Sequence, residues 1–334
     1  MTRFRSNIRC LHLLLIAAAL AFVGAERTAV AQSAATSPVT LKVALVKTAN
    51  ILVLQHGIDA GIFAKQGLAL DTTYVNNGPA IGSAIVSGSA EIGYAATVAV
   101  ISARANNQPL KLFAPLTVET YPNHFMTWYD AAGRLGPITV AQLKGRTIAM
   151  NAAGASCEMQ LRAYLEPAGV PWDSIRVLIL PFPQIAAALQ LGNADVGCFV
   201  QPFHAAAMLS PEIKARIVIA GTYPDLQRLH SELIDGFLGR DDWLKAHADE
   251  ALRFSRAMMI ASQDVMKDPS ILVALMERDL KIPAPVAAAV QPSFDTSSGP
   301  IREADIAASV ALMQKTGMLS QPVPASDMIF PVNR

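Results

Sequence analysis

Residues 79–93 (PAIGSAIVSGSAEIG) recur without a gap 104 residues later, as residues 183–197 (PQIAAALQLGNADVG). Six of the fifteen aligned positions are identical. In both copies a proline opens a helical pattern, apolar residues follow at helical spacing, a glycine supplies a left-handed cap and a short strand comes next. The chain is therefore predicted to use one local design, a helix followed by a strand, twice.

Strand-like runs precede both copies. With the same offset of 104 residues, KVALVK (42–47) aligns with RTIAMN (146–151). Residues 68–75 and 175–180 supply a second strand in each half. This order predicts an α/β fold of two lobes, each a mostly parallel sheet flanked by helices. A duplicated α/β enzyme would show the same order of strands and helices and is an alternative interpretation. In either case, ligands bind beyond the carboxyl ends of the strands.

The chain is expected to cross between the lobes twice, at residues 117–123 and near residues 231–238. Two crossings form a hinge. We expect the first lobe to contain residues 40–120 and 235–330, including the C-terminal helices, and the second lobe to contain residues 121–234.

Composition narrows the class of protein. The 334 residues are 52% hydrophobic and 16% charged, which is enough for a sizeable core and excludes a disordered chain. The chain has 27 Lys and Arg residues and 26 Asp and Glu residues, so its charge balance provides no basic surface that could neutralise a phosphate backbone. Nucleic acid is therefore not an expected partner.

The first 31 residues have the features of an export signal. Three arginines precede an apolar run at residues 11–23, and Ala-Val-Ala at residues 29–31 fits a signal peptidase site. The run is too short to cross a hydrocarbon core about 30 Å thick. We predict cleavage near Ala31, with a cut after Ala25 as the alternative.

Catalytic and metal-binding motifs are absent from the sequence. It contains no GxSxG, HExxH, GxxxxGK[ST] or GxGxxG motif in a suitable context, and its histidines lack metal-ligand spacing. A helix start at Cys157 favours a thiolate, but no general base is evident beside it. Whether Cys157 pairs with Cys198 is left open. No cofactor, metal or enzymatic activity is expected.

The predicted site consists of the loops that follow the strands. They are residues 48–50, 76–78 and 94–97 in the first lobe, and residues 152–158, 181–183 and 198–201 in the second. Ser156 opens a helix whose free N–H groups can hold a carboxylate, a sulfonate or another acceptor, although capping alone also explains this serine. Thr48 and Asn50 have the matching role in the first lobe. Asn77 is the contact candidate before Pro79, whereas Asn76 fits a simple turn.

Two candidates lie on the first crossing. Glu119 and Tyr121 either flank a bound molecule or are solvated hinge residues. If Glu119 and Glu158 face the cleft, they disfavour a purely anionic ligand and favour one with an amine or amidine-like donor.

Six segments together resemble the SsuA/THI5-like (NMT1) family of periplasmic substrate-binding proteins of ABC importers, which includes nitrate, sulfonate, taurine and thiamine-pyrimidine binders. The segments are LKVALVKTAN (41–50), GIDAGIFAKQGLAL (57–70), GSAIVSGSAEIGYAA (82–96), ITVAQLKGRTIAM (138–150), ALQLGNADVGCFVQPF (188–203) and DGFLGRDDWLKAHADEAL (235–252). The resemblance covers essentially residues 40–320.

The resemblance implies a periplasmic-binding-protein type II clamshell that closes over a small molecule in the periplasm. It implies an inner-membrane permease with a cytoplasmic ATPase as the partner, and a monomer. The candidate ligand-binding residues are Thr48, Asn50, Asn77, Gly78, Tyr94, Thr97, Glu119, Tyr121, Ser156, Cys157, Glu158, Phe199 and Gln201. The sequence lacks an obvious cleft Arg or Lys, which departs from the sulfonate and nitrate members. A periplasmic sensor partner of a receptor is the alternative. A THI5-like biosynthetic enzyme is another, but its cysteine-rich motif is missing here.

Overall fold

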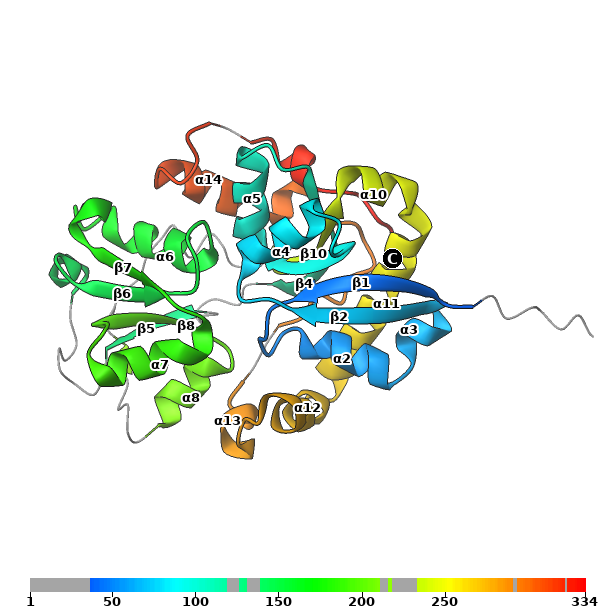
Figure 1. Cartoon of the computed structure of the whole chain (residues 1–334), viewed down its shortest axis with the longest axis horizontal. Coiled ribbons are helices and arrows are strands. Elements are labelled where there is room, and N and C mark those ends of the chain that lie inside the picture. The colour runs from blue at the N-terminus through cyan, green and yellow to red at the C-terminus, as the bar shows by residue number, and fades with distance from the viewer. Residues whose placement is uncertain are drawn as a thin grey trace, which may run out of the picture. The chain divides into compact units, whose positions relative to one another are not determined.

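A computed structural model describes residues 37–118, 126–130, 139–210, 216–217, 233–290, 293–321 and 323–334 of the chain (Figure 1). The predicted export signal, residues 1–31, lies outside the described residues, as do the candidate ligand contacts Glu119 and Tyr121.

Two five-stranded sheets form the framework. In spatial order, the first sheet consists of β2 (Leu68–Tyr74), β1 (Val39–Leu45), β3 (Ile92–Ala96), β10 (Leu233–Arg240) and β4 (Leu110–Val118). The second consists of β7 (Arg176–Ile179), β6 (Thr147–Met150), β8 (Val196–Val200), β5 (Met126–Asp130) and β9 (Arg216–Ile217). In each sheet the first three strands are parallel and the fourth is antiparallel to both of its neighbours. The prediction of two mostly parallel sheets is confirmed.

The strand registers correct the sequence alignment by one residue. Val43 pairs with Ile92 in the first sheet, and Ile148 pairs with Val196 in the second. The first strands of the two sheets are therefore related by an offset of 105 residues rather than 104. The reason is that the loop before the helix at Phe182–Leu191 is one residue shorter than the loop before the helix at Gly78–Val86. A shift of one residue moves every side chain of a strand to the opposite face. The superposition of KVALVK on RTIAMN was therefore wrong in register.

Hydrogen bonds confirm the corrected alignment. The backbone N–H of Lys42 donates to the Glu91 carboxylate at 2.9 Å, and that of Thr147 donates to the Asp195 carboxylate at 2.8 Å. An acidic side chain thus holds the neighbouring parallel strand at the same place in both sheets.

The repeated glycines allow each helix to pack on its strand. A Cβ atom on Gly93 would lie 2.2 Å from Cγ2 of Ile81, and one on Gly197 would lie 2.6 Å from Cγ2 of Ile185. No real Cβ atom sits so close to its neighbour, so a side chain at either position would push the helix off the sheet. The isoleucines belong to the equivalent helices α4 (Gly78–Val86) and α7 (Phe182–Leu191).

Helices cover both sheets (Figure 1). Those that pack mainly with elements of the first sheet are α2 (Leu52–Asp59), α3 (Ile62–Lys65), α4, α5 (Thr97–Ala105), α10 (Asp241–Ala246), α11 (Ala248–Lys267), α12 (Ser270–Leu280), α13 (Ala284–Ala288) and α14 (Ala307–Lys315). Helices α6 (Ser156–Leu165), α7 and α8 (Phe203–Leu209) follow strands of the second sheet along the chain. Helix α7 packs on β6 and β8, whereas α6 also contacts α5 and α14, and α8 contacts both β8 and α13. Short 3-10 helices occupy Val140–Leu143, Trp172–Ser174, Glu303–Asp305 and Ala325–Met328.

Helix α11 anchors the C-terminal part of the chain to the first sheet. Its Phe254 packs against Phe63, Phe113 and Phe237, with ring centroids 4.9 to 5.7 Å apart. Such tilted and edge-on pairs are the preferred arrangements of buried aromatic rings. No helix in the described part of the chain is long and apolar enough to span a bilayer.

Candidate ligand-binding site

A pocket of about 60 Å³ lies where the carboxyl ends of β1, β3, β6 and β8 come together. This is the position that the strand order predicts for a ligand site in α/β proteins. Both sheets contribute to it. Its lining residues are Val46, Thr48, Asn50, Gly78, Tyr94, Ala95, Ala96, Ala99, Asn151, Ala155, Ser156, Cys157, Phe182, Val200, Gln201 and Asp235.

The structure brings together candidates from five of the six predicted loops, and Phe182 lines the pocket from the sixth. The candidates that line the pocket are Thr48, Asn50, Gly78, Tyr94, Ser156, Cys157 and Gln201. Most of the other lining residues are small or apolar neighbours of these positions. The walls are therefore mainly apolar with a few polar groups, which is the usual make-up of a small-molecule site.

Two buried hydroxyl groups in the pocket make no hydrogen bond to the described residues. They are Thr48 Oγ1 from the first-sheet side and Ser156 Oγ from the second-sheet side. Thr48 is 7% exposed and Ser156 is 8% exposed. A buried hydroxyl without a partner loses free energy, so both groups favour a bound molecule that supplies one.

Capping does not account for Ser156. The N-cap residue of α6 is Ala155, which makes no side-chain cap bond, and Ser156 is the first residue inside the helix. Its hydroxyl is therefore not engaged in satisfying the N–H groups of the first turn. Side-chain capping therefore does not explain this serine, and ligand contact stays a prediction.

Asp235 is the principal residue that the sequence analysis missed. It is 1% exposed, and its four acceptor positions are filled. Its Oδ2 accepts from Asn50 Nδ2 at 2.9 Å and from the Tyr94 hydroxyl at 2.8 Å. Its Oδ1 accepts from the backbone N–H of Thr117 at 3.1 Å and from the Thr117 hydroxyl. An acidic residue inside the apolar run LIDGFLG (233–239) was the signal available in the sequence.

Burial raises the pKa of Asp235 from 3.8 to about 6, although the hydrogen bonds from Thr117, Tyr94 and Asn50 oppose the shift. The group is therefore mainly ionised at neutral pH. Burial, together with the charge of Asp235, holds the pKa of Tyr94 well above its usual value, so the phenol remains a donor. Among the described residues that line the pocket there is no Lys, Arg or His.

Two candidates use their side chains to fix the backbone beside the pocket. Asn77 is not among the residues that line the pocket, and its Oδ1 caps α4 by accepting from the N–H of Ala80 at 3.0 Å. Thr97 is buried and donates its hydroxyl to the carbonyl of Leu233 at 2.8 Å, which ties α5 to the start of β10. These bonds give both side chains a structural role beside the pocket, and their assignment as ligand contacts stays a prediction.

Two candidates in the second half also face away from the pocket. Glu158 accepts from the N–H of Gly154 at 2.9 Å and from Arg162 Nε at 2.7 Å, so its charge is paired within α6. Phe199 has no exposed surface and lies in the core, because it points to the opposite side of β8 from Val200. Asp235, rather than Glu158, places negative charge at the pocket.

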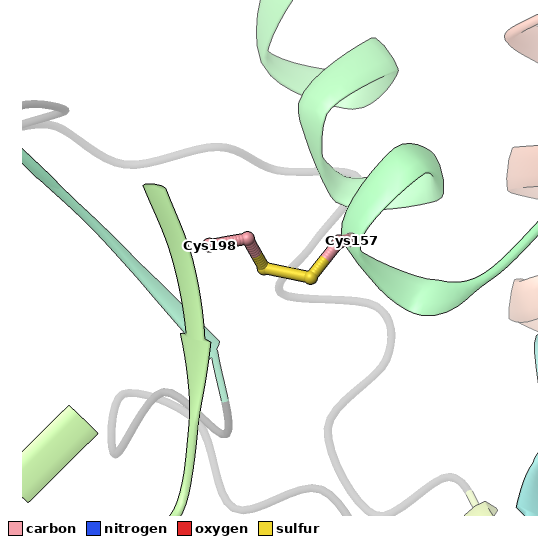
Figure 2. Close-up of a disulfide and its surroundings, with 2 residues drawn as sticks. All are labelled: Cys157 and Cys198. Atoms are coloured by element: carbon pink, nitrogen blue, oxygen red, sulfur yellow. A yellow bond between two sulfur atoms is a disulfide. The ribbon is translucent and has the colours of Figure 1, made fainter. Parts of the chain in front are cut away.

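Cys157 and Cys198 form a disulfide, with their Cα atoms 6.1 Å apart (Figure 2). The bond joins the first turn of α6 to the middle of β8, which settles the pairing that the sequence left open. A cysteine in a disulfide is not a nucleophile, so the thiolate interpretation of Cys157 was wrong. The bond fixes the segment that carries Ser156 against the strand that leads to Gln201.

Two hydrogen bonds join the two halves next to the pocket, one between two loops and one between α5 and a loop. The N–H of Ala49 donates to the carbonyl of Gln201 at 3.3 Å. The hydroxyl of Ser102 donates to the carbonyl of Gly154 at 3.0 Å. The pocket is thus bordered by direct contacts between elements of the first and second sheets.

The model of the family described as NMT1/THI5 like matches residues 48–271, about two thirds of the chain. This protein belongs to the NMT1/THI5-like family. The chain has no significant match among curated proteins.

The NMT1/THI5-like chain is similar in structure to several solved binding proteins. The alkanesulfonate-binding protein SsuA from Xanthomonas axonopodis pv. citri, solved with MOPS, matches with a TM-score of 0.73 and 19% identity over 88% of this chain and 99% of that one. The periplasmic aliphatic sulphonate-binding protein SsuA from Escherichia coli matches with a TM-score of 0.68 and 20% identity, over 89% of this chain and 94% of that one. The periplasmic nitrate-binding protein NrtA from Synechocystis PCC 6803 matches with a TM-score of 0.64 and 13% identity, over 87% of this chain and 91% of that one. The fold is the type II fold of periplasmic binding proteins.

A metal centre is not built from the described part of this NMT1/THI5-like chain. No group of three or more His, Cys, Asp or Glu side chains lies close enough there to hold an ion. The polar groups that the pocket offers are hydroxyls, amides and backbone N–H groups around one carboxylate, which is an arrangement suited to hydrogen bonding.

Proposed function

We propose that this protein is the solute-binding component of an ABC importer, and that it binds a small polar organic molecule in the pocket between its two sheets. The observation that carries the proposal is the pair of unpartnered buried hydroxyls, Thr48 and Ser156, which face one pocket from different sheets. Membership of the NMT1/THI5-like family and the binding-protein fold support it.

The binding mechanism follows from the two-sided pocket. A molecule that bonds to Thr48 and Asn50 on one side and to Ser156 and Gln201 on the other gains its full set of contacts only when the halves are together. Ligand binding therefore favours the closed arrangement by the difference in contacts between the two states. The bond from Ala49 to Gln201 belongs to the same closed arrangement.

The candidate ligand classes are sulfonates, carboxylates and pyrimidine-like molecules. The start of α6 offers N–H groups to an acceptor, whereas the buried carboxylate of Asp235 repels negative charge. Because every acceptor position of Asp235 is already filled, this carboxylate sets the local potential and holds Asn50 and Tyr94 in place.

Export and delivery complete the proposal. Removal of residues 1–31 releases the protein into the periplasm as a monomer, where the closed form presents its ligand to an inner-membrane permease with a cytoplasmic ATPase. Activity as an enzyme is not part of this role, and a bound compound is released chemically unchanged.

A thermal-shift screen of the mature protein with sulfonates, carboxylates, amino acids and pyrimidines tests the proposal. A ligand that binds only the folded state raises its apparent stability by RT ln(1 + [L]/Kd). We expect one class to raise the melting temperature of the wild type and to do so less for Ser156→Ala. The surface variant Ser87→Ala is the control, because its hydroxyl bonds only to neighbouring residues. Equal shifts in all three proteins would contradict the assigned site.

A further inference from the structure

Helix α6 is buried on all sides, although it carries several polar side chains. Nine of its ten residues are buried, and Arg162 is the exception. Its polar and charged side chains are those of Ser156, Glu158, Gln160 and Arg162. A helix that covers one face of a sheet normally turns such residues to water. Elements of the first half supply the cover here, because α6 contacts α5 and α14. The helix that carries Ser156 is therefore enclosed by the other half of the molecule.

One contact between the halves lies at the N-terminal end of α6. Gly154 has a φ of +69°, a left-handed conformation that favours glycine, and its N–H donates to the carboxylate of Glu158 at 2.9 Å. This bond fixes the loop two residues before Ser156. The carbonyl of Gly154 accepts from the hydroxyl of Ser102 on α5 at 3.0 Å. Glu158 therefore orients the loop, and Ser102 holds it against the first half.

A second contact between the halves joins α6 to the C-terminal end of α14. Arg162 Nη1 donates to the carbonyl of Thr316, the C-cap residue of α14, at 3.5 Å. Carbonyl groups at a helix C-terminus lack partners within the helix and attract positive charge. The guanidinium carbon of Arg162 lies 3.9 Å from the ring centroid of Trp172, which supports the side chain in this direction. Beside it, Lys315 Nζ on α14 lies 3.4 Å from the carboxylate of Glu166, the C-cap residue of α6.

The carboxylate of Glu158 links the two contacts. One of its oxygens accepts from Gly154, and the other accepts from Arg162 Nε at 2.7 Å. Hydrogen bonds therefore run without a break from Ser102 on α5, along α6, to the end of α14. None of these residues lines the pocket. We call the contacts between the halves the α6 clasp, which consists of the pairs Ser102–Gly154, Arg162–Thr316 and Lys315–Glu166.

We infer that the α6 clasp stabilises the arrangement in which both sheets line the pocket, and that Ser102 is a positioning residue for the site. Each clasp contact exists only while the halves are together, so its loss favours their separation. Affinity falls with the fraction of molecules in the binding-competent arrangement, so the clasp sets the apparent affinity without touching the ligand. The inference goes beyond the proposed function, because it concerns the balance between closed and open protein and holds whatever the ligand is.

Hydrogen exchange of one backbone amide tests the inference without a ligand. The N–H of Ala49 donates to the carbonyl of Gln201 in the other half at 3.3 Å, whereas that of Val75 donates to Leu45 within the first half at 2.8 Å. Separation of the halves exposes the first amide and leaves the second protected. The rates are measured by NMR on the mature protein, under conditions in which exchange reports the opening equilibrium. Ser102→Ala should speed the exchange of Ala49 about 2- to 12-fold, which corresponds to one lost hydrogen bond, and leave Val75 unchanged.

The matched control is Ser83→Ala, because the hydroxyl of Ser83 donates to the carbonyl of Pro79 within α4 and not across the halves. This variant should leave both exchange rates as they are in the wild type. If Ala49 exchanges at one rate in the wild type, Ser102→Ala and Ser83→Ala, the clasp inference is overturned, while the proposed function still stands. Equal acceleration of Ala49 and Val75 by Ser102→Ala would also overturn it, because the lost bond would then stabilise the first half alone.

The ion pair at the other end of the clasp is tested by exchanging its charges. Lys315→Glu brings two carboxylates together, and Glu166→Lys brings two ammonium groups together. Each single variant should speed the exchange of Ala49 by about 1.4- to 5-fold, a small effect because both side chains are nearly half exposed. The double variant Lys315→Glu/Glu166→Lys restores opposite charges and should return the rate to that of the wild type. A double variant with the product of the two single effects would remove this pair from the clasp.

Discussion

The two sheets share one strand order, but different chemistry secures the pocket side of each. In the first sheet, a buried carboxylate on β10 gathers Asn50, Tyr94 and Thr117 by hydrogen bonds. In the second, the disulfide between Cys157 and Cys198 joins α6 to β8. A repeated backbone therefore determines where the loops converge, while the means of holding them there is specific to each half. The four predictions below test this difference, in order of decreasing effect.

Loss of the disulfide should have the largest effect. Cys157 and Cys198 are separated by 41 residues. Closing a loop of this length in the unfolded chain stabilises the folded state by about 4 kcal/mol in the chain-entropy description. We expect the double variant Cys157→Ser/Cys198→Ser to unfold at lower urea concentration than the oxidised wild type.

Reductant provides the control for this comparison. It should lower the midpoint of the wild type and leave that of the double variant unchanged. Identical urea curves for the oxidised wild type and the double variant would show that the bond adds no stability.

The buried carboxylate of Asp235 should make the free energy of unfolding change with pH, by about 3 kcal/mol in all. Because burial raises the pKa of Asp235 from 3.8 to about 6, the folded state holds the proton more tightly than the unfolded state. The protonated carboxyl group therefore stabilises the folded state fully below about pH 4, and this stabilisation is lost as the pH rises through 6. Its size follows from the pKa difference between the two states, at about 1.36 kcal/mol for each pKa unit.

Asp235→Asn isolates this contribution from the other titrating groups. The free energy of unfolding of the wild type, measured relative to the variant, should decline between pH 4 and pH 7. A constant difference between the two proteins across this pH range would refute the assignment.

The equivalent glycines test the part that the two sheets share. Gly93→Ala and Gly197→Ala should each destabilise the protein by about 1 to 3 kcal/mol, because an added methyl overpacks the contact between helix and strand. The effect should be larger at Gly93, where the approach to Ile81 is 2.2 Å, than at Gly197, where the approach to Ile185 is 2.6 Å.

A rescue experiment shows whether the clash is the cause. The double variant Gly93→Ala/Ile81→Ala lacks the clashing Cγ2 and should lose less stability than the sum of the losses in Gly93→Ala and Ile81→Ala, as measured by urea unfolding. If Gly93→Ala is as stable as the wild type, the proposed reason for the repeated glycine is wrong.

The hydroxyls that face the pocket should have the smallest effects, and these should be on binding. Thr48→Ala and Ser156→Ala each remove one hydrogen bond to a ligand and should weaken binding by about 0.5 to 1.5 kcal/mol. Neither hydroxyl bonds to a described residue, so stability without ligand should change little. Calorimetry with a compound from the thermal-shift screen measures the first quantity and urea unfolding the second. A large loss of stability without ligand would assign these hydroxyls to the fold.

Much of the framework could be predicted because it depends on local patterns. The helix and strand of each copy, the capping glycines and the loops at the strand ends follow from residue spacing alone. The one-residue error in the strand alignment arose in the loop before α7, where a shorter connection leaves no trace in a comparison without gaps. The structural bonds of Asn77 and Thr97 could not be predicted, since their partners Ala80 and Leu233 become evident only once the chain is folded.

The sequence by itself determined that two copies of one α/β design would present their small-residue loops at the strand ends, because helix and strand periodicity and the need for glycine at close contacts are local properties. Only the tertiary structure decided which side chains meet there. Asp235 is far from Asn50 and Tyr94 in the sequence, and Cys157 is 41 residues from Cys198. Their contacts depend on the order of strands in each sheet, which local propensity does not encode.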